Sequence, residues 1–281
     1  MNAYKIKSYA KINLALNVTG KLTKLHKIES IVAFVDLHDL ITLKQTKNSK
    51  HIIRFTGKFS KDIKKKNTVQ KLFNILDKQK LLINEKFQIR ITKNIPQEAG
   101  LGGGSMNAAS ILNFLINKKF IKLNKKKIFE ISSLIGSDVI LGINPTNTIL
   151  KSNNTLKKFF NCQRLYTLLV KPNFGCSTKE IYLEVNKFTK SKFNKPKKKM
   201  FDPNFLINQN NSLERIAFSK YPKLKTIKSF LETLKPLLFV RMTGSGSTII
   251  GYFKSKQDCE LAKVQFKRKF KDYWCNTSKT I

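Results

Sequence analysis

The sequence predicts a mixed α and β fold, built as one large domain or two modest domains. Segments that alternate apolar and polar residues, as half-buried strands do, are interspersed with segments whose apolar residues recur at helical spacing. A length of 281 residues is enough for a substantial core. Four glycines within five residues separate a strand-like segment from a helix-like segment, and this order is the strongest local signal in the chain.

The first predicted strand covers residues 4–18 and includes Ala10-Lys11-Ile12-Asn13-Leu14. Lys11 and Asn13 are two residues apart, so they share one face of a strand. One interpretation is an edge strand that exposes both side chains to solvent. The other is the floor of an active site, where a lysine stabilises a nearby carboxylate or lowers the pKa of a hydroxyl.

Further strands are predicted at residues 31–35, 40–43, 51–55 and 87–91, with a helix between the last two. That helix opens at Asn67 and continues to about residue 81, with Val69, Leu72, Phe73 and Leu76 on one face. From the residues alone, Asn67 is equally well explained as the N-cap of this helix.

The glycine-rich loop follows the strand at 87–91 and precedes a second helix. Glycines let the backbone approach a ligand closely, and a helix N-terminus favours an anion, so we expect a phosphate cradle. Ser105 is the expected N-cap of the helix. The loop is neither a Walker A motif nor a clean GxGxxG motif. The alternative interpretation is a flexible turn.

Asp138 follows a predicted helix over residues 125–135 and the helix-terminating Gly136. An aspartate in this position is most often a turn former. Beyond it, residues 151–161 form a linker or hairpin, and the lysine-rich segment 187–199 is predicted to be a mobile loop. The remaining predicted elements are a strand at 165–170, helices at 179–185, 222–234 and 256–270, a strand–glycine turn–strand over 238–253 and a strand at 273–275.

A net charge of +38 raises the question of nucleic-acid binding. Only six of the 55 basic residues are arginine, which is the residue that recognises bases and phosphates in bidentate geometry. The lysines are spread over a chain rich in Asn, Ile and Phe, which favours a compositional bias over a nucleic-acid partner.

No apolar run approaches the roughly 20 residues of a membrane span, and the first residues lead directly into a strand pattern, so neither a membrane partner nor a signal peptide is expected. The four cysteines have no paired spacing, which disfavours a zinc site or a disulfide framework. A reducing cytoplasm is the expected location.

The segment Pro96-x-x-x-Gly-Leu-Gly-Gly-Gly-Ser-x-Asn-Ala-Ala resembles the ATP-phosphate loop of the GHMP kinases. Ala10-Lys11-Ile12-Asn13-Leu14 and Thr243-Gly-Ser-Gly-Ser247 are similar to two other motifs of that family, in the same order. The resemblance implies an α+β fold of two domains, a ribosomal protein S5 domain 2-like domain over 1–150 and an α/β-plait-like domain over 151–281. It also implies an active site in the cleft between the domains.

Site residues follow from the same resemblance. Lys11 and Asp138 match the catalytic pair, and Asn13, His26 and Thr178 match substrate-binding positions. The residues that match the ATP site are Pro96, Gln97, Glu98, Ala99, Gly100, Leu101, Gly102, Gly103, Gly104, Ser105, Met106 and Asn67. No metal-ligating residue is assigned, although Mg²⁺ is expected to accompany ATP.

Three positions depart from the family pattern. Leu25 stands where relatives carry the tyrosine that stacks on cytosine, Ile140 replaces a proline and Ser212 replaces an aspartate. The loss at Leu25 leaves two alternatives, a weaker affinity for the nucleotide or another aromatic residue that substitutes for the tyrosine.

The triple glycine followed by Ser-x-Asn-Ala-Ala is similar to the branch of the family that acts on 4-diphosphocytidyl-2-C-methyl-D-erythritol. This implies ATP-dependent phosphorylation of the substrate's 2-hydroxyl, in the non-mevalonate route to isoprenoid precursors, by a monomer or weak homodimer. The alternatives are another small-alcohol kinase of the family, a kinase-like protein without activity, and a basic nucleic-acid-binding module.

Overall fold

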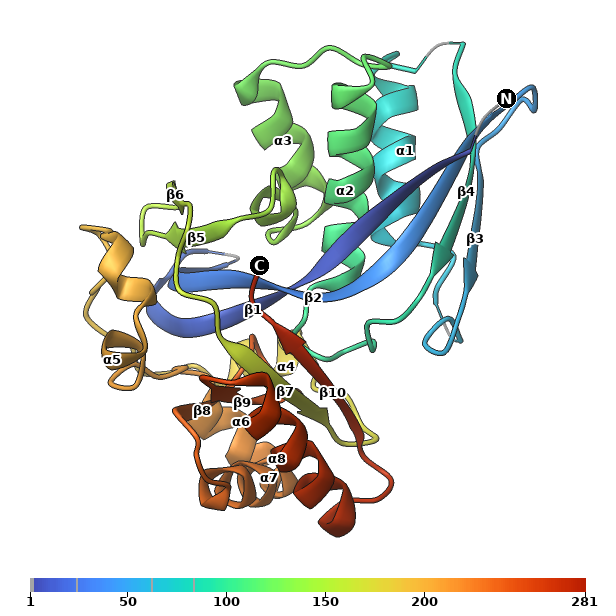
Figure 1. Cartoon of the computed structure of the whole chain (residues 1–281). Helices are drawn as coiled ribbons and strands as arrows, with labels where there is room; N and C mark the ends of the chain where they lie inside the picture. Colours follow the sequence, from blue (N-terminus) through green and yellow to red (C-terminus); the bar gives the residue numbers. More distant parts are fainter. Residues whose placement is uncertain (1–2, 24, 62, 83) are drawn as a thin grey trace. The chain divides into compact units, whose positions relative to one another are not determined.

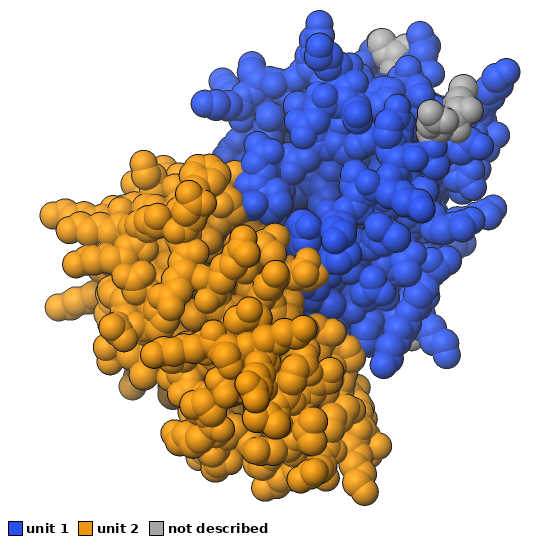
Figure 2. All heavy atoms as spheres, in the orientation of Figure 1, with its two compact units in different colours: residues 1–11, 37–97, 102–145 blue, residues 12–36, 98–101, 146–281 orange. Residues whose placement is uncertain are grey.

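The computed structural model describes residues 3–23, 25–61, 63–82 and 84–281. Within these residues the chain forms two compact units (Figure 2). Unit 1 comprises residues 1–11, 37–97 and 102–145, and unit 2 comprises residues 12–36, 98–101 and 146–281. The units are therefore discontinuous in sequence. The predicted boundary between two functional domains at residue 150 stays a prediction.

The two longest strands contribute residues to both units (Figure 1). They are β1 (Tyr4–Lys21) and β2 (His26–Thr46). Strand β2 merges the two strands predicted at residues 31–35 and 40–43, because the intervening residues remain extended. The predicted α+β fold is confirmed by the interspersed helices and the strands described below.

Unit 1 packs helices against strands. The C-terminal half of β2 pairs antiparallel with β4, and β3 pairs parallel with β4. Helices α1, α2 and α3 lie side by side (Figure 1) and share an apolar core with Ile41, Leu43, Ile89 and Ile91 of the strands. The bounds are β3 (Ile52–Thr56), α1 (Thr68–Lys78), β4 (Lys86–Thr92), α2 (Gly103–Asn117), α3 (Lys125–Ile135) and the 3-10 helix η1 (Val139–Gly142).

Unit 2 contains an antiparallel sheet in the order β10-β7-β9-β8, with α7 and α8 packed on it. The N-terminal half of β2 pairs with β5, which forms a hairpin with β6 where a linker or hairpin was predicted. The bounds are β5 (Asn147–Leu150), β6 (Leu156–Phe159), β7 (Tyr166–Lys171), α4 (Thr178–Leu183), η2 (Lys198–Phe201), α5 (Pro203–Leu206), α6 (Glu214–Lys220), α7 (Pro222–Thr233), β8 (Phe239–Met242), β9 (Ile249–Phe253), α8 (Lys256–Lys269) and β10 (Trp274–Lys279).

Two local predictions need correction. Helix α2 begins at Gly103 with Gly102 as its N-cap, so Ser105 lies inside the first turn and does not cap it. Gly102 takes this position because its left-handed backbone points its carbonyl at the amide of Met106, 2.9 Å away. The segment predicted to be a mobile loop, residues 187–199, is held by hydrogen bonds to Glu29 and by the fully buried Phe193.

Candidate active site

Lys11 and Asp138, which are far apart in the sequence, form an ion pair in unit 1. The Lys11 Nζ lies 3.2 Å from Asp138 Oδ2, and the side chains are 6% and 33% exposed, respectively. Lys11 is an interior residue of β1 between the buried Ala10 and Ile12. Asp138 directly precedes η1. The structure thus combines a buried ammonium with a carboxylate that solvent or a ligand can reach.

The second half of the glycine-rich loop passes directly beside Lys11. Gly102 has a φ of +67°, and a Cβ at this position would lie 2.8 Å from Cγ of Lys11. A side chain is therefore excluded by both backbone conformation and space. Gly103 and Gly104 follow as the first residues of α2, where a Cβ would lie 3.1 Å from Ile95 Cγ2 and 3.2 Å from Thr68 Oγ1, respectively, so the first turn of the helix presents bare backbone.

A second helix N-terminus lies at the same loop. Thr68, the first residue of α1, donates a hydrogen bond of 2.6 Å from Oγ1 to the Gly104 carbonyl. Asn67 caps α1, since its Oδ1 accepts from the amides of Val69 and Gln70 at 3.1 and 3.0 Å. The capping interpretation of Asn67 is confirmed. The positive ends of two helix dipoles meet here, which favours an anion.

The start of the loop is held by a buried carboxylate that the sequence analysis missed. Asp39 is fully buried and accepts hydrogen bonds from the amides of Asn94 and Ile95 at 2.7 and 2.9 Å. It also accepts from Asn107 in α2 at 3.0 Å and pairs with Lys93. The signal available in the sequence was a polar residue within an otherwise apolar strand pattern. Asp39 lies in such a pattern in β2. Asp39 therefore ties β2, β4 and α2 together around the loop.

The remaining predicted loop residues of unit 1 are placed as follows. Gln97 donates from Nε2 to the carbonyls of Phe59 and Lys61 at 3.1 and 2.6 Å. The side chains of Pro96 and Met106 are buried, whereas Ser105 is partly exposed in the first turn of α2. The two buried side chains pack inside the unit, so these residues can offer a ligand only main-chain groups.

In unit 2, residues 98–101 lie against the turn between β8 and β9. The amides of Ser247 and Thr248 donate to the carbonyls of Glu98 and Ala99 at 3.4 and 3.3 Å. Thr243 Oγ1 donates to the Gly100 carbonyl at 3.2 Å. Gly100 has a φ of +71°, and any Cβ there would collide with the Thr243 carbonyl oxygen. The Thr-Gly-Ser-Gly-Ser motif therefore packs on the first half of the glycine-rich loop.

Asn13 organises the same turn from β1. Its amide donates to Thr243 Oγ1 at 3.0 Å, and its side-chain oxygen accepts from the Gly244 amide at 3.0 Å. Its Nδ2 donates to Ser30 Oγ at 2.8 Å. Asn211, which precedes Ser212, donates to the carbonyls of Met242 and Gly244 at 2.9 and 2.7 Å. Both asparagines support the glycine turn from inside unit 2.

Thr178 begins α4 and lies on the other side of this turn. Its Oγ1 lies 2.9 Å from Oγ of Ser245, and Thr178 itself is exposed. The hydroxyl is thus held at the end of a short helix, where it remains accessible to a ligand.

His26, the first residue of β2, lies beside an aromatic residue that the sequence analysis did not identify. The Tyr182 ring of α4 is 5.2 Å from the His26 ring, and the Phe188 ring is 6.5 Å away. Leu25 is 65% exposed. Tyr182 therefore occupies the neighbourhood where a stacking partner is required, and only the folded chain brings it there.

The imidazole of His26 is partly buried. Burial lowers its pKa, and the Lys21 ammonium lowers it further. Its buried Nε2 makes no hydrogen bond with any part of the chain that the structure describes. A buried polar nitrogen without a protein partner is costly, which is a physical sign of a binding position.

Comparison with known families decides the classification. The family model described as GHMP kinases N terminal domain matches residues 67–146, and that described as GHMP kinases C terminal matches residues 192–272. A curated 4-diphosphocytidyl-2-C-methyl-D-erythritol kinase from Pelagibacter ubique (strain HTCC1062) is 58% identical over the full length of both chains. The chain belongs to the GHMP kinase family. A Clostridium tetani (strain Massachusetts / E88) relative with the same name is 33% identical over 99% of this GHMP kinase chain and all of its own length.

Solved structures share the GHMP kinase fold. A crystal structure of 4-(cytidine 5'-diphospho)-2C-methyl-D-erythritol kinase has a TM-score of 0.79 and 22% identity, covering 98% of this chain and 99% of that one. A homoserine kinase from Cytophaga hutchinsonii has a TM-score of 0.72 and 14% identity, with coverage of 100% and 95%. The family shares this architecture among enzymes with different names, so the fold does not select the substrate.

Proposed function

We propose that this GHMP kinase transfers the γ-phosphoryl group of ATP to the 2-hydroxyl of 4-diphosphocytidyl-2-C-methyl-D-erythritol. The observation that carries the proposal is the Lys11–Asp138 ion pair directly beside the side-chain-free Gly102. The substrate is suggested by the names of the relatives that match over the full chain at 58% and 33% identity. Lys11 and Asp138 act as the catalytic pair in this proposal.

ATP fits the glycine-rich loop of unit 1. A side chain at Gly102 would fill the space beside Lys11, and the N-termini of α1 and α2 provide unpaired amides and positive dipole ends. A triphosphate matches this arrangement because it needs many donors at close range and no side chains in the way. We assign Gly102, Gly103, Gly104 and Ser105 to the phosphates.

In the reaction, Asp138 accepts the proton of the 2-hydroxyl as its oxygen forms a bond to the γ-phosphorus. The bond from that phosphorus to the bridging oxygen breaks, and ADP leaves with the electron pair. Lys11 orients Asp138 through the ion pair of 3.2 Å. Positioning and charge stabilisation supply most of the rate gain in phosphoryl transfer.

Mg²⁺ would be bound mainly by the triphosphate. Within the residues that the structure describes, no group of three His, Cys, Asp or Glu side chains could hold a metal ion. Mg²⁺ commonly binds substrate phosphates and several waters with few protein ligands, so this arrangement fits the ion, and the Ser105 hydroxyl in the first turn of α2 would be its ligand in unit 1. When bound, Mg²⁺ neutralises charge on the phosphate oxygens.

The cytosine ring is proposed to bind beside His26 in unit 2. The imidazole, whose Nε2 has no hydrogen-bond partner within the described residues, supplies a polar contact, and Tyr182 supplies a stacking face in place of the tyrosine missing at position 25. The exposed hydroxyl of Thr178 is assigned to the remainder of the substrate. Asn13, whose amide contacts Ser30 and Gly244, is assigned to the substrate as well.

We propose a cytoplasmic monomer or weak homodimer acting in the non-mevalonate route to isoprenoid precursors. The four cysteines are free thiols, which suits a reducing compartment. None of the helices in the described part of the chain combines the length and apolar character needed to cross a bilayer.

The test is a steady-state assay of ADP release with ATP, Mg²⁺ and 4-diphosphocytidyl-2-C-methyl-D-erythritol, with phosphorus NMR to locate the new phosphate. Mevalonate and homoserine serve as competing substrates, because the fold is shared with their kinases. A higher kcat/KM for either alcohol would replace the proposed substrate. Salt-dependent binding of DNA or RNA without ADP release would instead favour the nucleic-acid alternative.

A further inference from the structure

A buried carboxylate in unit 2 holds a segment of chain that the catalytic motifs do not include. Glu29 in β2 is fully buried. Its Oε1 accepts from Nδ2 of Asn17 at 2.9 Å and from the Lys192 amide at 2.7 Å. Its Oε2 accepts from Oγ of Ser191 at 2.6 Å and from the Phe193 amide at 3.0 Å. One carboxylate thus ties three consecutive residues to the β1–β2 hairpin.

We name residues 187–194 the strap. On one side of the Glu29 contacts, the amide of Thr189 donates to the Val18 carbonyl of β1 at 2.9 Å. On the other side, Asn194 Oδ1 accepts from the hydroxyl and amide of Ser152 at 2.9 and 3.3 Å. Phe193 is fully buried between these points. The strap is therefore fastened along its length, with Glu29 at its centre.

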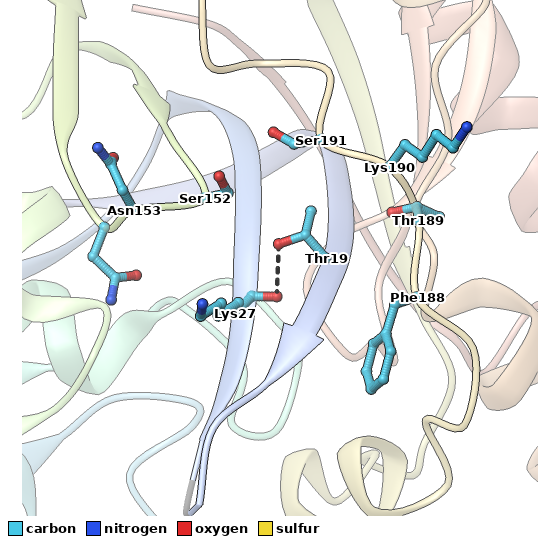
Figure 3. Close-up of a pocket in the computed structure, with 9 residues that line it drawn as sticks. Thr19, Lys27, Ser152, Asn153, Phe188, Thr189, Lys190 and Ser191 are labelled. Atoms are coloured by element: carbon cyan, nitrogen blue, oxygen red, sulfur yellow. Dashed lines mark hydrogen bonds between the residues drawn. The ribbon is translucent and has the colours of Figure 1, made fainter.

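The strap forms one wall of a cavity of about 660 Å³ in unit 2 (Figure 3). Thr19 and Lys27 line it from the β1–β2 hairpin, and the turn after β5 lines it opposite the strap. Lys27 follows His26 directly in β2, so the two side chains point to opposite faces of the strand. The cavity is thus separate from the face of the hairpin that carries His26.

Phe188 connects the strap to both faces. Phe188 lines the cavity and its ring also lies 6.5 Å from the His26 ring, although the residue is 47% exposed and so is not fixed by burial. Its position therefore depends on where the strap is held. The nearest fixed points are Thr189 and the three residues bound by Glu29.

We propose that Glu29 is a positioning residue for substrate recognition. By clamping residues 191–193 it sets the place of Phe188 next to His26, where the proposed function puts the cytosine ring. The inference rests on that proposed function for its substrate. A carboxylate is required at position 29 because each of its two oxygens accepts hydrogen bonds from two donors. In a glutamine, the amide NH₂ would replace one oxygen and would face two donors without being able to accept from them.

The test compares Glu29→Gln with wild type in two measurements. In the kinase assay we expect the KM for the diphosphocytidyl substrate to rise at least fivefold, with kcat and the KM for ATP changed less than twofold. In limited trypsin digestion we expect cleavage after Lys187, Lys190 or Lys192 to be at least tenfold faster, because these lysines are already exposed and the loss of the Glu29 hydrogen bonds frees the backbone around them to enter a protease site. Ser191→Ala, which removes one of the four donors, should shift both measurements in the same direction by less.

The control is Phe266→Leu, a core substitution in α8 of the same unit. This substitution lowers stability without contacting the strap. It should therefore change neither the ratio of the KM for the diphosphocytidyl substrate to the KM for ATP nor the cleavage at the strap lysines. An unchanged substrate KM in Glu29→Gln, or unchanged strap cleavage, would overturn the positioning role alone. Absence of turnover in the wild-type protein would overturn the proposed function and the positioning role that rests on it.

Discussion

The ammonium of Lys11 lies 3.2 Å from the carboxylate of Asp138, with the glycine-rich loop passing next to the lysine stem. The lysine comes from the middle of a long strand, and the aspartate comes from the turn after a helix. Neither residue is exceptional in its own segment. Their contact, together with the absence of a Cβ at Gly102, creates a place where a phosphate and a proton acceptor meet.

Asp138→Asn should lower kcat by about 10²–10⁴-fold, the usual contribution of a general base. The amide cannot accept the hydroxyl proton, whereas the loop that holds the phosphates is unchanged. The KM for ATP, or the binding of a fluorescent ATP analogue, should stay within about threefold of wild type. Wild-type turnover in this variant would remove Asp138 from the mechanism.

Gly102→Ala should impair ATP use. The added methyl would meet Cγ of Lys11 at 2.8 Å, and the left-handed backbone adds strain of about 1–2 kcal/mol for a non-glycine residue. We expect a raised KM for ATP and a lower kcat in the ADP-release assay. The control is Gly20→Ala, where the new Cβ would lie 3.6 Å from Lys27 Cδ in ordinary contact, and near-normal kinetics are expected.

Asp39→Asn should destabilise the protein by about 3–5 kcal/mol, because it leaves the buried Lys93 ammonium without its counter-charge. Urea unfolding followed by circular dichroism measures this change. The matched control is Glu130→Gln, which breaks the surface pair with Lys127 and should shift stability by no more than about 0.5 kcal/mol. Equal effects of the two variants would contradict the assigned role of Asp39.

The stability of the protein should fall as the pH is lowered from 7.5 to 5.5, in part through His51. Burial lowers the pKa of this histidine and outweighs the opposing effect of Asp77, while Lys86 lowers the pKa further. The ring nitrogen Nδ1 accepts from the Phe87 amide at 3.1 Å, a contact that protonation would break. The unfolded chain therefore takes up the proton at a higher pH than the folded chain, and stability is lost below about pH 6.5.

His51→Asn isolates this contribution. Asparagine can place an acceptor near the Phe87 amide but does not titrate, so the pH dependence of the unfolding free energy should be shallower than in wild type. Chemical denaturation at pH 7.5, 6.5 and 5.5 measures the slope for both proteins. Identical slopes would show that His51 keeps the same pKa in the folded and unfolded chains.

Tyr182→Ala should raise the KM for the diphosphocytidyl substrate by about tenfold or more, since stacking of a base on an aromatic ring contributes roughly 1–3 kcal/mol. Tyr182→Phe retains the ring and should remain close to wild type. The KM for ATP serves as the internal reference in both variants. A similar loss in the phenylalanine variant would assign the effect to the hydroxyl and not to stacking.

Local sequence determined the elements whose signals lie within a few residues. The helix over 125–135 was predicted with the bounds observed, because apolar periodicity and a terminating glycine are both local. The strand, glycine loop and helix around residue 100 were likewise evident in order. The N-cap was predicted at Ser105, whereas the structure has it at Gly102. The sequence could not show this, because nothing in the composition distinguishes the one glycine with the left-handed capping conformation from its three neighbouring glycines.

Tertiary structure alone decided which polar groups meet. Glu29 and Tyr182 each belong to an ordinary strand or helix pattern. Their partners, like those of Asp39, lie many residues away in the sequence. The alternation of side chains along a strand shows which residues share a face, but not which segment covers that face. The strap was therefore predicted to be mobile, because its hydrogen bonds to Glu29 cannot be inferred from the sequence. The sequence by itself determined the order of strand, glycine-rich loop and helix, predicted that the loop binds phosphate, and named Lys11 and Asp138 as a pair. Only folding could bring that lysine and aspartate together, because long-range contacts depend on how whole elements pack.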